Sequence, residues 1–213
     1  MAGEGRGPGA GNAAKGQVSR RAEYAETTRR AIVDEARRLF SEKGYFATRV
    51  DDIAAAARVS PATVYAVTGG KQGLLRTLID QWSAAPVVAE GLKRIEEFDD
   101  PDEILRHLAH LTREMRQDYG DIMRAVIAAA PHDATAAEGL ATGTARYRAG
   151  TTFVAQRLAD LGALRDGLDA DDAADILWFY LGYAGFFTLV DDNGWSYARA
   201  EEWLRQAARQ ALL

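Results

Sequence analysis

Apolar residues in the stretch 50–69 recur at the spacing of two short helices joined by a tight turn. Ser60 followed by Pro61 is typical of a helix start, because serine caps free backbone amides and proline supplies the helical φ. The pattern therefore predicts a helix-turn-helix unit. Its inward-facing set is expected to be Ile53, Ala54, Ala57, Val59, Val64 and Val67.

A longer amphipathic helix is expected before this unit, from Glu26 to Lys43, and Gly44 marks its end. Its apolar residues recur at i, i+4, i+7 and i+8, whereas its arginines take other faces. Thr48 and Asp51 match a capping box, which predicts that the second helix starts at Thr48. The third helix is expected over about 61–67. Together these elements predict a three-helix DNA-binding domain over residues 25–71.

The rest of the chain, residues 72–213, is predicted to form a larger helical domain for ligand binding and dimerisation. Pro86 is expected to kink or divide its first helix, and Gly120 is interpreted as a break between two others. No convincing strand is present, so the predicted fold class is all-α. The expected helices are 71–97, 101–119, 121–130, 136–163, 170–190 and 195–212.

The apolar run 176–190 has two interpretations, a membrane span or a helix buried on all sides. Its 15 residues cover roughly 22 Å at about 1.5 Å per residue, which is short of the roughly 30 Å hydrocarbon layer. Aspartates at 175, 191 and 192 flank the run. We therefore expect a buried helix that contacts its own domain and a second subunit.

Charge is distributed unevenly along the chain. Residues 1–72 contain 12 Lys and Arg against 8 Asp and Glu, a net charge of +4, whereas the remainder carries −9. The positive field that DNA phosphates require is therefore confined to the N-terminal third. Residues 1–24 are Gly-rich and predict a disordered basic arm without the apolar stretch of a signal peptide. The absence of cysteine excludes disulfides and fits a cytoplasmic protein.

The order of these motifs resembles the tetracycline-repressor (TetR) family of bacterial transcriptional regulators, over about residues 28–75. The matching motifs are Gly44-Tyr45, Thr48-x-Val50-x-x-Ile53-Ala54-x-x-Ala57, Val59-Ser60-Pro61-x-Thr63-Val64-Tyr65 and Lys71-x-x-Leu74-Leu75. The resemblance implies a ligand-responsive repressor that binds a palindromic operator in double-stranded DNA as a homodimer.

The resemblance also implies roles for individual side chains. Thr48, Arg49 and Lys71 would contact phosphates. The N-terminal part of the third helix would enter the major groove. Its candidate residues are Ser60, Pro61, Ala62, Thr63 and Tyr65.

Two positions depart from the family pattern. Arg58 and Thr68 stand where the family usually has a glycine and an aromatic residue. A left-handed Arg58 would cost on the order of 1 kcal/mol, unless a phosphate contact or an altered turn compensates. Arg58 is therefore added to the candidate DNA contacts.

Candidate ligand-pocket and dimer residues come from the helical body. Bundles build small-molecule sites between helices, so a small hydrophobic ligand is expected among large residues of the middle helices. These candidates are Met115, Tyr119, Met123, Tyr147, Phe153, Trp178, Phe179 and Tyr183. A two-fold dimer built from the last two helices of each chain would use Gly182, Gly185, Phe186, Trp203, Leu204 and Ala207.

Two other classes of function remain as alternatives. Residues 103–114 contain an ExxxHxxHxxxE pattern with His107 and His110, but ligands spread over about three turns do not converge on one metal ion. No serine lies in a nucleophile turn, and the Gly-x-Gly groupings lack a preceding strand. No enzyme activity, metal or cofactor is therefore expected. The second alternative is a protein-interaction module that no longer reads DNA.

Overall fold

The computed structural model describes the backbone of residues 10–213 and the side chains of residues 22–213. The chain divides into two compact units, Met1–Thr77 and Leu78–Leu213, and the division falls within the helix α4 (Gly70–Ser83). Each unit is described by itself. Residues 1–9 of the predicted arm lie outside the described residues.

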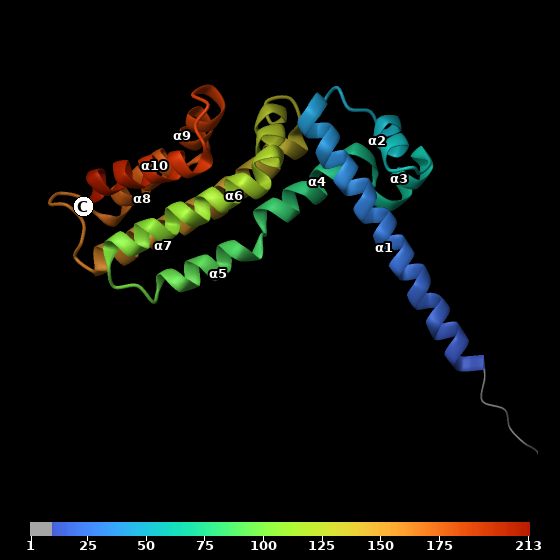
Figure 1. Ribbon diagram of the computed structural model, residues 1–213, viewed down its shortest axis with the longest axis horizontal. Coiled ribbons are helices and arrows are strands. Elements are labelled where there is room, and N and C mark those ends of the chain that lie inside the picture. Colours follow the sequence, from blue (N-terminus) through green and yellow to red (C-terminus); the bar gives the residue numbers. More distant parts are fainter. Residues whose placement is uncertain (1–9) are drawn as a thin grey trace, which may run out of the picture. The chain divides into compact units, whose positions relative to one another are not determined.

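The N-terminal unit contains α1 (Ala10–Lys43), α2 (Val50–Ala56), α3 (Pro61–Thr68) and the first turns of α4 (Figure 1). Within it, α2 contacts α3, and both contact α1. Apolar residues that were predicted to face inward are buried, among them Ile32, Phe40, Ile53 and Val64. The helix-turn-helix prediction is therefore confirmed, although Ala57, Val59 and Val67 are only half-buried.

Two predicted helix starts are wrong. α1 begins at Ala10, so residues 10–24 are helical instead of disordered. Once the helix over 26–43 exists, each added residue gains a backbone hydrogen bond without a new nucleus, and residues 10–24 include four alanines, the best helix former. α2 begins at Val50, because Asp52 and not Asp51 reaches back, where its Oδ2 accepts from the Arg49 amide at 3.1 Å.

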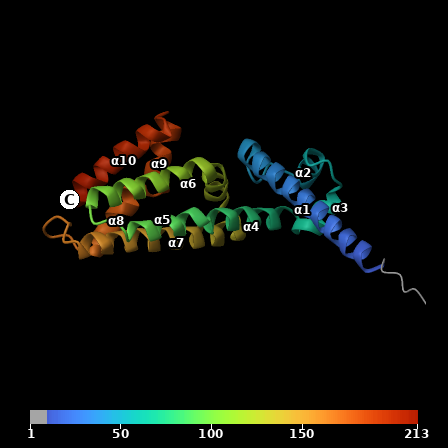
Figure 2. The same ribbon diagram turned by 60° about the horizontal axis from the view of Figure 1, so that its bottom comes forward.

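The C-terminal unit packs its long helices side by side (Figures 1 and 2). α7 contacts α8 and α6, while α10 contacts α6 and α8 and α5 contacts α6 and α7. Asp100, Asp133 and Ser196 cap the starts of α6, α7 and α10 through their side-chain oxygens. After α4 its elements are α5 (Pro86–Ile95), α6 (Pro101–Ala129), α7 (Ala134–Asp160), α8 (Ala170–Leu181), α9 (Tyr183–Phe187), the π-helical turn η1 (Thr188–Asp192) and α10 (Tyr197–Leu212). Apart from its helix boundaries, the all-α prediction is confirmed.

Two glycines act differently from the prediction. α6 runs through Gly120 without a break. The missing side chain of Gly120 leaves room for Arg124, whose Nη1 lies 2.7 Å from the place of a Cβ atom. Arg124 uses that room to bind Asp191 through two bonds of 2.6 Å. The expected helix 170–190 instead breaks at Gly182, where the backbone is extended and a Cβ atom would lie 2.4 Å from the Trp178 carbonyl oxygen.

Among the described residues, one stretch is long and apolar enough to cross a membrane by length and composition, Ala170–Asp192. In the structure it forms three pieces, α8, α9 and η1. Leu177, Leu181, Phe186 and Leu189 from these pieces belong to the core of the C-terminal unit. One face of this stretch therefore belongs to the core of its own domain, whereas Phe179 is exposed.

Candidate functional site

The first turn of α3 presents the predicted groove residues at the surface. Ser60 Oγ accepts from the Thr63 amide at 3.1 Å and lies 2.8 Å from Thr63 Oγ1, so this pair caps the helix. Pro61 and Ala62 are exposed, whereas Val64 on the opposite face is fully buried. One face of α3 thus holds the helix in its domain and leaves small polar and apolar side chains for a partner.

Tyr65 is the large side chain on this exposed face, with 59% of its surface accessible. Its ring covers Gly70, where a Cβ atom would lie 2.7 Å from Cε1. Gly70 also has a φ of +79°, so both the conformation and the space favour glycine there. The ring is therefore positioned by the α3–α4 turn while its surface stays accessible.

The turn between α2 and α3 has the geometry that glycine usually provides. Arg58 has a φ of +55° and is the non-glycine residue with a positive φ in the described part of the chain. Its amide donates to the Ala55 carbonyl at 3.2 Å, and the Val59 amide donates to Ala54 at 2.9 Å. These are the two bonds of a Schellman motif, so the turn is not altered. The side chain of Arg58 is exposed.

Thr48 lies where its side chain cannot reach DNA. It is 1% exposed, and its single hydroxyl hydrogen is shared between the carbonyls of Gly44 (2.9 Å) and Leu39 (3.1 Å). The predicted phosphate contact of its side chain is therefore wrong, because the hydroxyl joins the end of α1 to the start of α2. Arg49 is exposed at the N-cap of α2 and stays a candidate.

Replacing Thr48 by valine is expected to lower the free energy of unfolding of the N-terminal unit by about 1–3 kcal/mol. Valine keeps the shape but removes the donor that the buried Leu39 contact and the part-buried Gly44 contact share. Urea denaturation monitored by circular dichroism measures the change. Thr27→Val, which removes an exposed hydroxyl bonded to Glu23, is the control and should stay within about 0.5 kcal/mol of the parent protein. Equal losses in both variants would contradict the assignment.

Lys71 has partners within its own domain. Its Nζ donates to the carbonyls of Tyr45 (2.8 Å) and Thr48 (3.2 Å), lies 3.5 Å from that of Phe46, and stands 4.3 Å from the centre of the Tyr45 ring. An ammonium has three donors, and these carbonyls use them. Lys71 therefore holds the α1–α2 connection, and its predicted contact with a phosphate stays a prediction.

A cavity of about 70 Å³ lies among α4, α5, α6, α7 and α9 in the C-terminal unit. It contains Met115, Met123, Tyr147 and Tyr183 from the predicted pocket set. Sequence reasoning missed Trp82, Thr112, Arg116 and Thr151, which also line it. The helical spacing could have indicated that Arg116 is buried. It lies four residues after Thr112 and seven before Met123, on the buried face of α6.

The other four predicted pocket residues lie elsewhere. Tyr119 is half-buried and Phe153 lines a shallow hollow beside Arg157 instead. Phe179 is 73% exposed and lines a second, larger hollow, called the outer hollow below. Trp178 lines this outer hollow too, although its ring packs on Tyr147 and Tyr183. Trp178 and Phe179 are neighbours on α8, where successive residues are about 100° apart around the helix, so their side chains point in different directions.

Only some of the predicted dimer residues lie together in the structure. An open hollow of about 980 Å³ is lined by Gly182, Gly185, Trp203 and Leu204. Phe186 is 0% exposed and packs near Tyr197 inside its own domain, so its predicted interface role is wrong. Ala207 is half-buried and does not line the hollow. The glycines serve the α8–α9 junction, because added Cβ atoms would meet backbone oxygens of that junction.

The histidines of residues 103–114 have local partners. His107 Nε2 lies 3.1 Å from the Gly91 carbonyl, and burial lowers the pKa of His107. His110 lies 3.4 Å from both Glu114 and Glu201. Among the described residues no group of three acidic or histidine side chains converges as metal ligands would.

Comparison with known proteins identifies similar regulators. Residues 32–78 match the family model described as bacterial regulatory proteins, tetR family. A curated relative described as an uncharacterized HTH-type transcriptional regulator, YdeS of Bacillus subtilis (strain 168), is 28% identical over 178 residues, covering 82% of this chain and 85% of the relative. These findings confirm the predicted resemblance.

Two solved structures share the whole architecture. A transcriptional regulator from Saccharomonospora viridis in complex with choline matches with a TM-score of 0.73 and 20% identity, covering 88% of this chain and 98% of that one. The regulator FadR from Bacillus subtilis in complex with stearoyl-CoA matches with a TM-score of 0.67 and 15% identity, covering 86% and 98%. At these identities the likeness establishes the fold.

Proposed function

We propose that this chain, a DNA-binding transcriptional regulator of the tetR family, is a cytoplasmic repressor that binds a palindromic operator as a homodimer and releases it when a small hydrophobic ligand binds. We assign DNA binding to residues 25–71 and ligand binding with dimerisation to residues 72–213. Neither role requires enzymatic chemistry. The observation that carries the proposal is the first turn of α3, exposed on one face and anchored by Val64 on the other.

The chemistry of this turn suits DNA. Hydroxyls of Ser60, Thr63 and Tyr65 can bond phosphates or base edges, and Ala62 can meet a thymine methyl group. Exposed Arg49 and Arg58 supply positive charge at the start and end of α2. Coupling to a ligand requires that the ligand binds two arrangements of the dimer with different affinity. Choline and stearoyl-CoA in the two relatives support a ligand site in this fold.

A second copy is the proposed occupant of the outer hollow. Phe179 and Trp203 are large apolar side chains on its rim, with exposed fractions of 73% and 48%. Exposed aromatic residues around an apolar hollow are typical of protein interfaces. A two-fold dimer also suits a palindromic site, because the symmetry of protein and DNA then agree.

Selection of duplexes from a random pool by the purified protein tests the function. We expect recovered sequences to contain inverted half-sites whose centres are about 10 base pairs, or a multiple of that distance, apart. Binding should weaken steeply with salt, because phosphate contacts release counterions. No enrichment and no salt dependence would instead support the protein-interaction module.

Arg58→Gly should weaken binding to the selected duplex and reduce the slope of log affinity against log salt by about 0.9, the value for one phosphate contact. Glycine suits the left-handed turn, so the free energy of unfolding should not fall. Fluorescence anisotropy over a salt series measures the slope. Arg38→Gln, an arginine paired with Glu35 and Glu42 on α1, is the control expected to keep it. An unchanged slope in Arg58→Gly would remove Arg58 from the interface.

A further inference from the structure

One arginine of the C-terminal domain is buried in the wall of the cavity. Arg116 lies in the middle of α6, is 1% exposed, and lines the cavity beside Met115, Met123 and Tyr147. A guanidinium stays charged in proteins, and a buried charge is costly unless it is paired or fully hydrogen-bonded. The partners of Arg116 therefore indicate whether the site is complete.

Those partners are neutral and few. Nη2 donates to the Leu181 carbonyl at 3.2 Å, and Nη1 donates to the sulfur of Met123 at 3.5 Å, which is a weak acceptor. The Tyr147 and Tyr183 ring centres lie 5.2 and 4.8 Å from Cζ, within cation–π range. Nε is buried without a hydrogen-bond partner. The Tyr147 hydroxyl is a further hydrogen-bond partner of the guanidinium. Among the described residues, the oxygen partners of Arg116 are thus a backbone carbonyl and a phenol, both neutral.

Two other arginines show which kind of partner Arg116 lacks. Arg113 and Arg157 also have a buried Nε without a hydrogen-bond partner. Arg113 Nε itself nevertheless lies 2.7 Å from Glu201 Oε2 in an ion pair, and Arg157 Nη2 forms one with Asp99 at 2.8 Å. Within the part of the chain that the structure describes, no carboxylate forms an ion pair with Arg116. Burial accordingly lowers the pKa of Arg116.

We infer that this cavity binds a monocarboxylate with an apolar body, whose two oxygens accept hydrogen bonds from Arg116. The planar guanidinium matches a carboxylate, and one buried cation balances one negative charge. Trp82, Leu108 and Leu111 provide apolar surface for the body of the ligand. A cationic ligand is excluded from this cavity, since Arg116 already occupies the space beside the aromatic rings. The inference rests on the proposed function only for the effect of the ligand on DNA binding.

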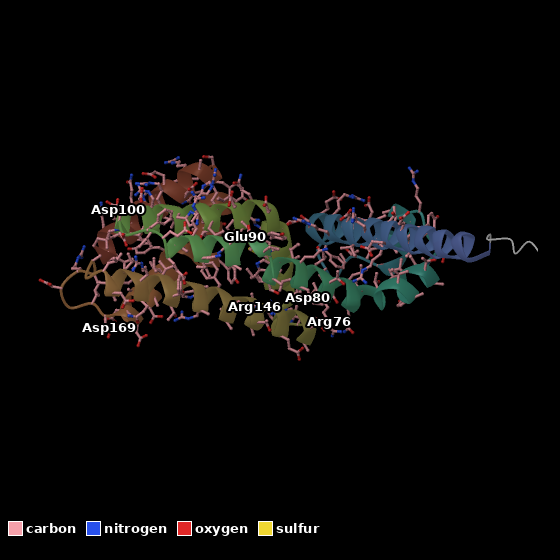
Figure 3. All side chains as sticks on the ribbon, turned by 90° about the horizontal axis from the view of Figure 1, so that it is seen from below. Arg76, Asp80, Glu90, Asp100, Arg146 and Asp169 are labelled. Atoms are coloured by element: carbon pink, nitrogen blue, oxygen red, sulfur yellow. The ribbon has the colours of Figure 1, made fainter. Side chains whose placement is uncertain are left out.

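The size of the cavity suits the head of such a ligand. Its 70 Å³ exceeds the roughly 10–15 Å³ that one water needs, but lies below the roughly 300 Å³ of a drug-sized pocket. The apolar body therefore requires side chains to move outward. Arg146 of α7, labelled in Figure 3, lies at the edge of the cavity. Its Nη1 donates to the Ser83 carbonyl at 3.0 Å and to the Ser83 hydroxyl at 2.8 Å.

Matched eight-carbon probes test the inference. Isothermal titration of the full chain with sodium octanoate, octan-1-ol and octyltrimethylammonium separates charge from chain length. We expect saturable binding of octanoate, at least tenfold tighter than the alcohol, and no saturable binding of the ammonium compound. Carboxylates from butanoate to dodecanoate are included, so that the length of the chain does not decide the result.

Arg116→Met should weaken carboxylate binding at least tenfold and leave alcohol binding unchanged. Arg116→Lys keeps the positive charge but loses the paired N–H donors of the guanidinium. Its affinity for octanoate should lie between those of the parent protein and Arg116→Met. Arg106→Met, which removes an exposed arginine from the same helix, is the control that should bind octanoate as the parent protein does. Circular dichroism verifies that each variant is folded.

Three results would overturn the inference: no saturable binding by any carboxylate, equal affinity for octanoate and octanol, or full octanoate affinity in Arg116→Met. Binding of the selected duplex without any additive tests the proposed function separately. If octanoate binds through Arg116 and operator affinity does not change, the carboxylate site stands and the ligand-responsive part of the proposed function fails. If duplex binding is also absent, the carboxylate site still stands by itself.

Discussion

Replacing Phe179 and Trp203 together by glutamate is expected to make the protein monomeric and to weaken its binding to a palindromic duplex by about 10²–10⁴-fold. Both side chains lie on the rim of the outer hollow and are largely exposed in the single chain, so the change leaves its core intact. In a dimer, the new carboxylates would be buried without partners. Sedimentation velocity gives the oligomeric state, and fluorescence anisotropy gives the affinity.

A duplex with a single half-site provides the internal comparison. The monomeric variant should bind it as well as the parent protein does, because the loss comes from the second half-site and not from α3. Gln117→Glu with Gln156→Glu adds the same two charges at exposed positions of α6 and α7, and should remain dimeric. A dimeric Phe179→Glu/Trp203→Glu variant would mean that copies associate through another surface.

The DNA-binding unit could be predicted from the sequence because local chemistry determines it. The Ser60-Pro61 start and the apolar spacing of α2 and α3 each act within a few residues, and the structure agrees with them. The error at Thr48 has a different cause. Its hydroxyl is used by Leu39, nine residues earlier, and capping patterns do not include such a contact. The internal partners of Lys71 were not predictable for the same reason, since these carbonyls lie 23 to 26 residues away.

The cavity was harder to predict because it depends on which faces of five elements meet. Choosing large apolar residues found Met115, Met123, Tyr147 and Tyr183, but it could not separate the two faces of α8. It also missed Arg116, because charged residues on amphipathic helices usually face solvent. Only the helix register, with Thr112 four residues before, places that charge on the buried face.

Arg116→Met is expected to raise the free energy of unfolding by about 1–4 kcal/mol, as apolar replacement of buried charges commonly does. The carbonyl of Leu181 keeps an acceptor bond without Arg116, since Tyr147 Oη donates to it at 2.8 Å. Methionine can fill the space between Met115 and Met123 without burying a charge. Urea denaturation at neutral pH should show a higher midpoint with an unchanged slope.

Arg157→Met provides the matched comparison. Arg157 also has an unbonded Nε, but it forms an ion pair with Asp99 and donates to the Phe98 carbonyl at 3.0 Å, so its loss should lower stability or leave it unchanged. A lower midpoint for Arg116→Met would make Arg116 a structural cap of α8. If the free energy of unfolding instead rises while carboxylate binding is lost, Arg116 lowers stability but is needed for binding. That trade-off is expected of a ligand-binding residue.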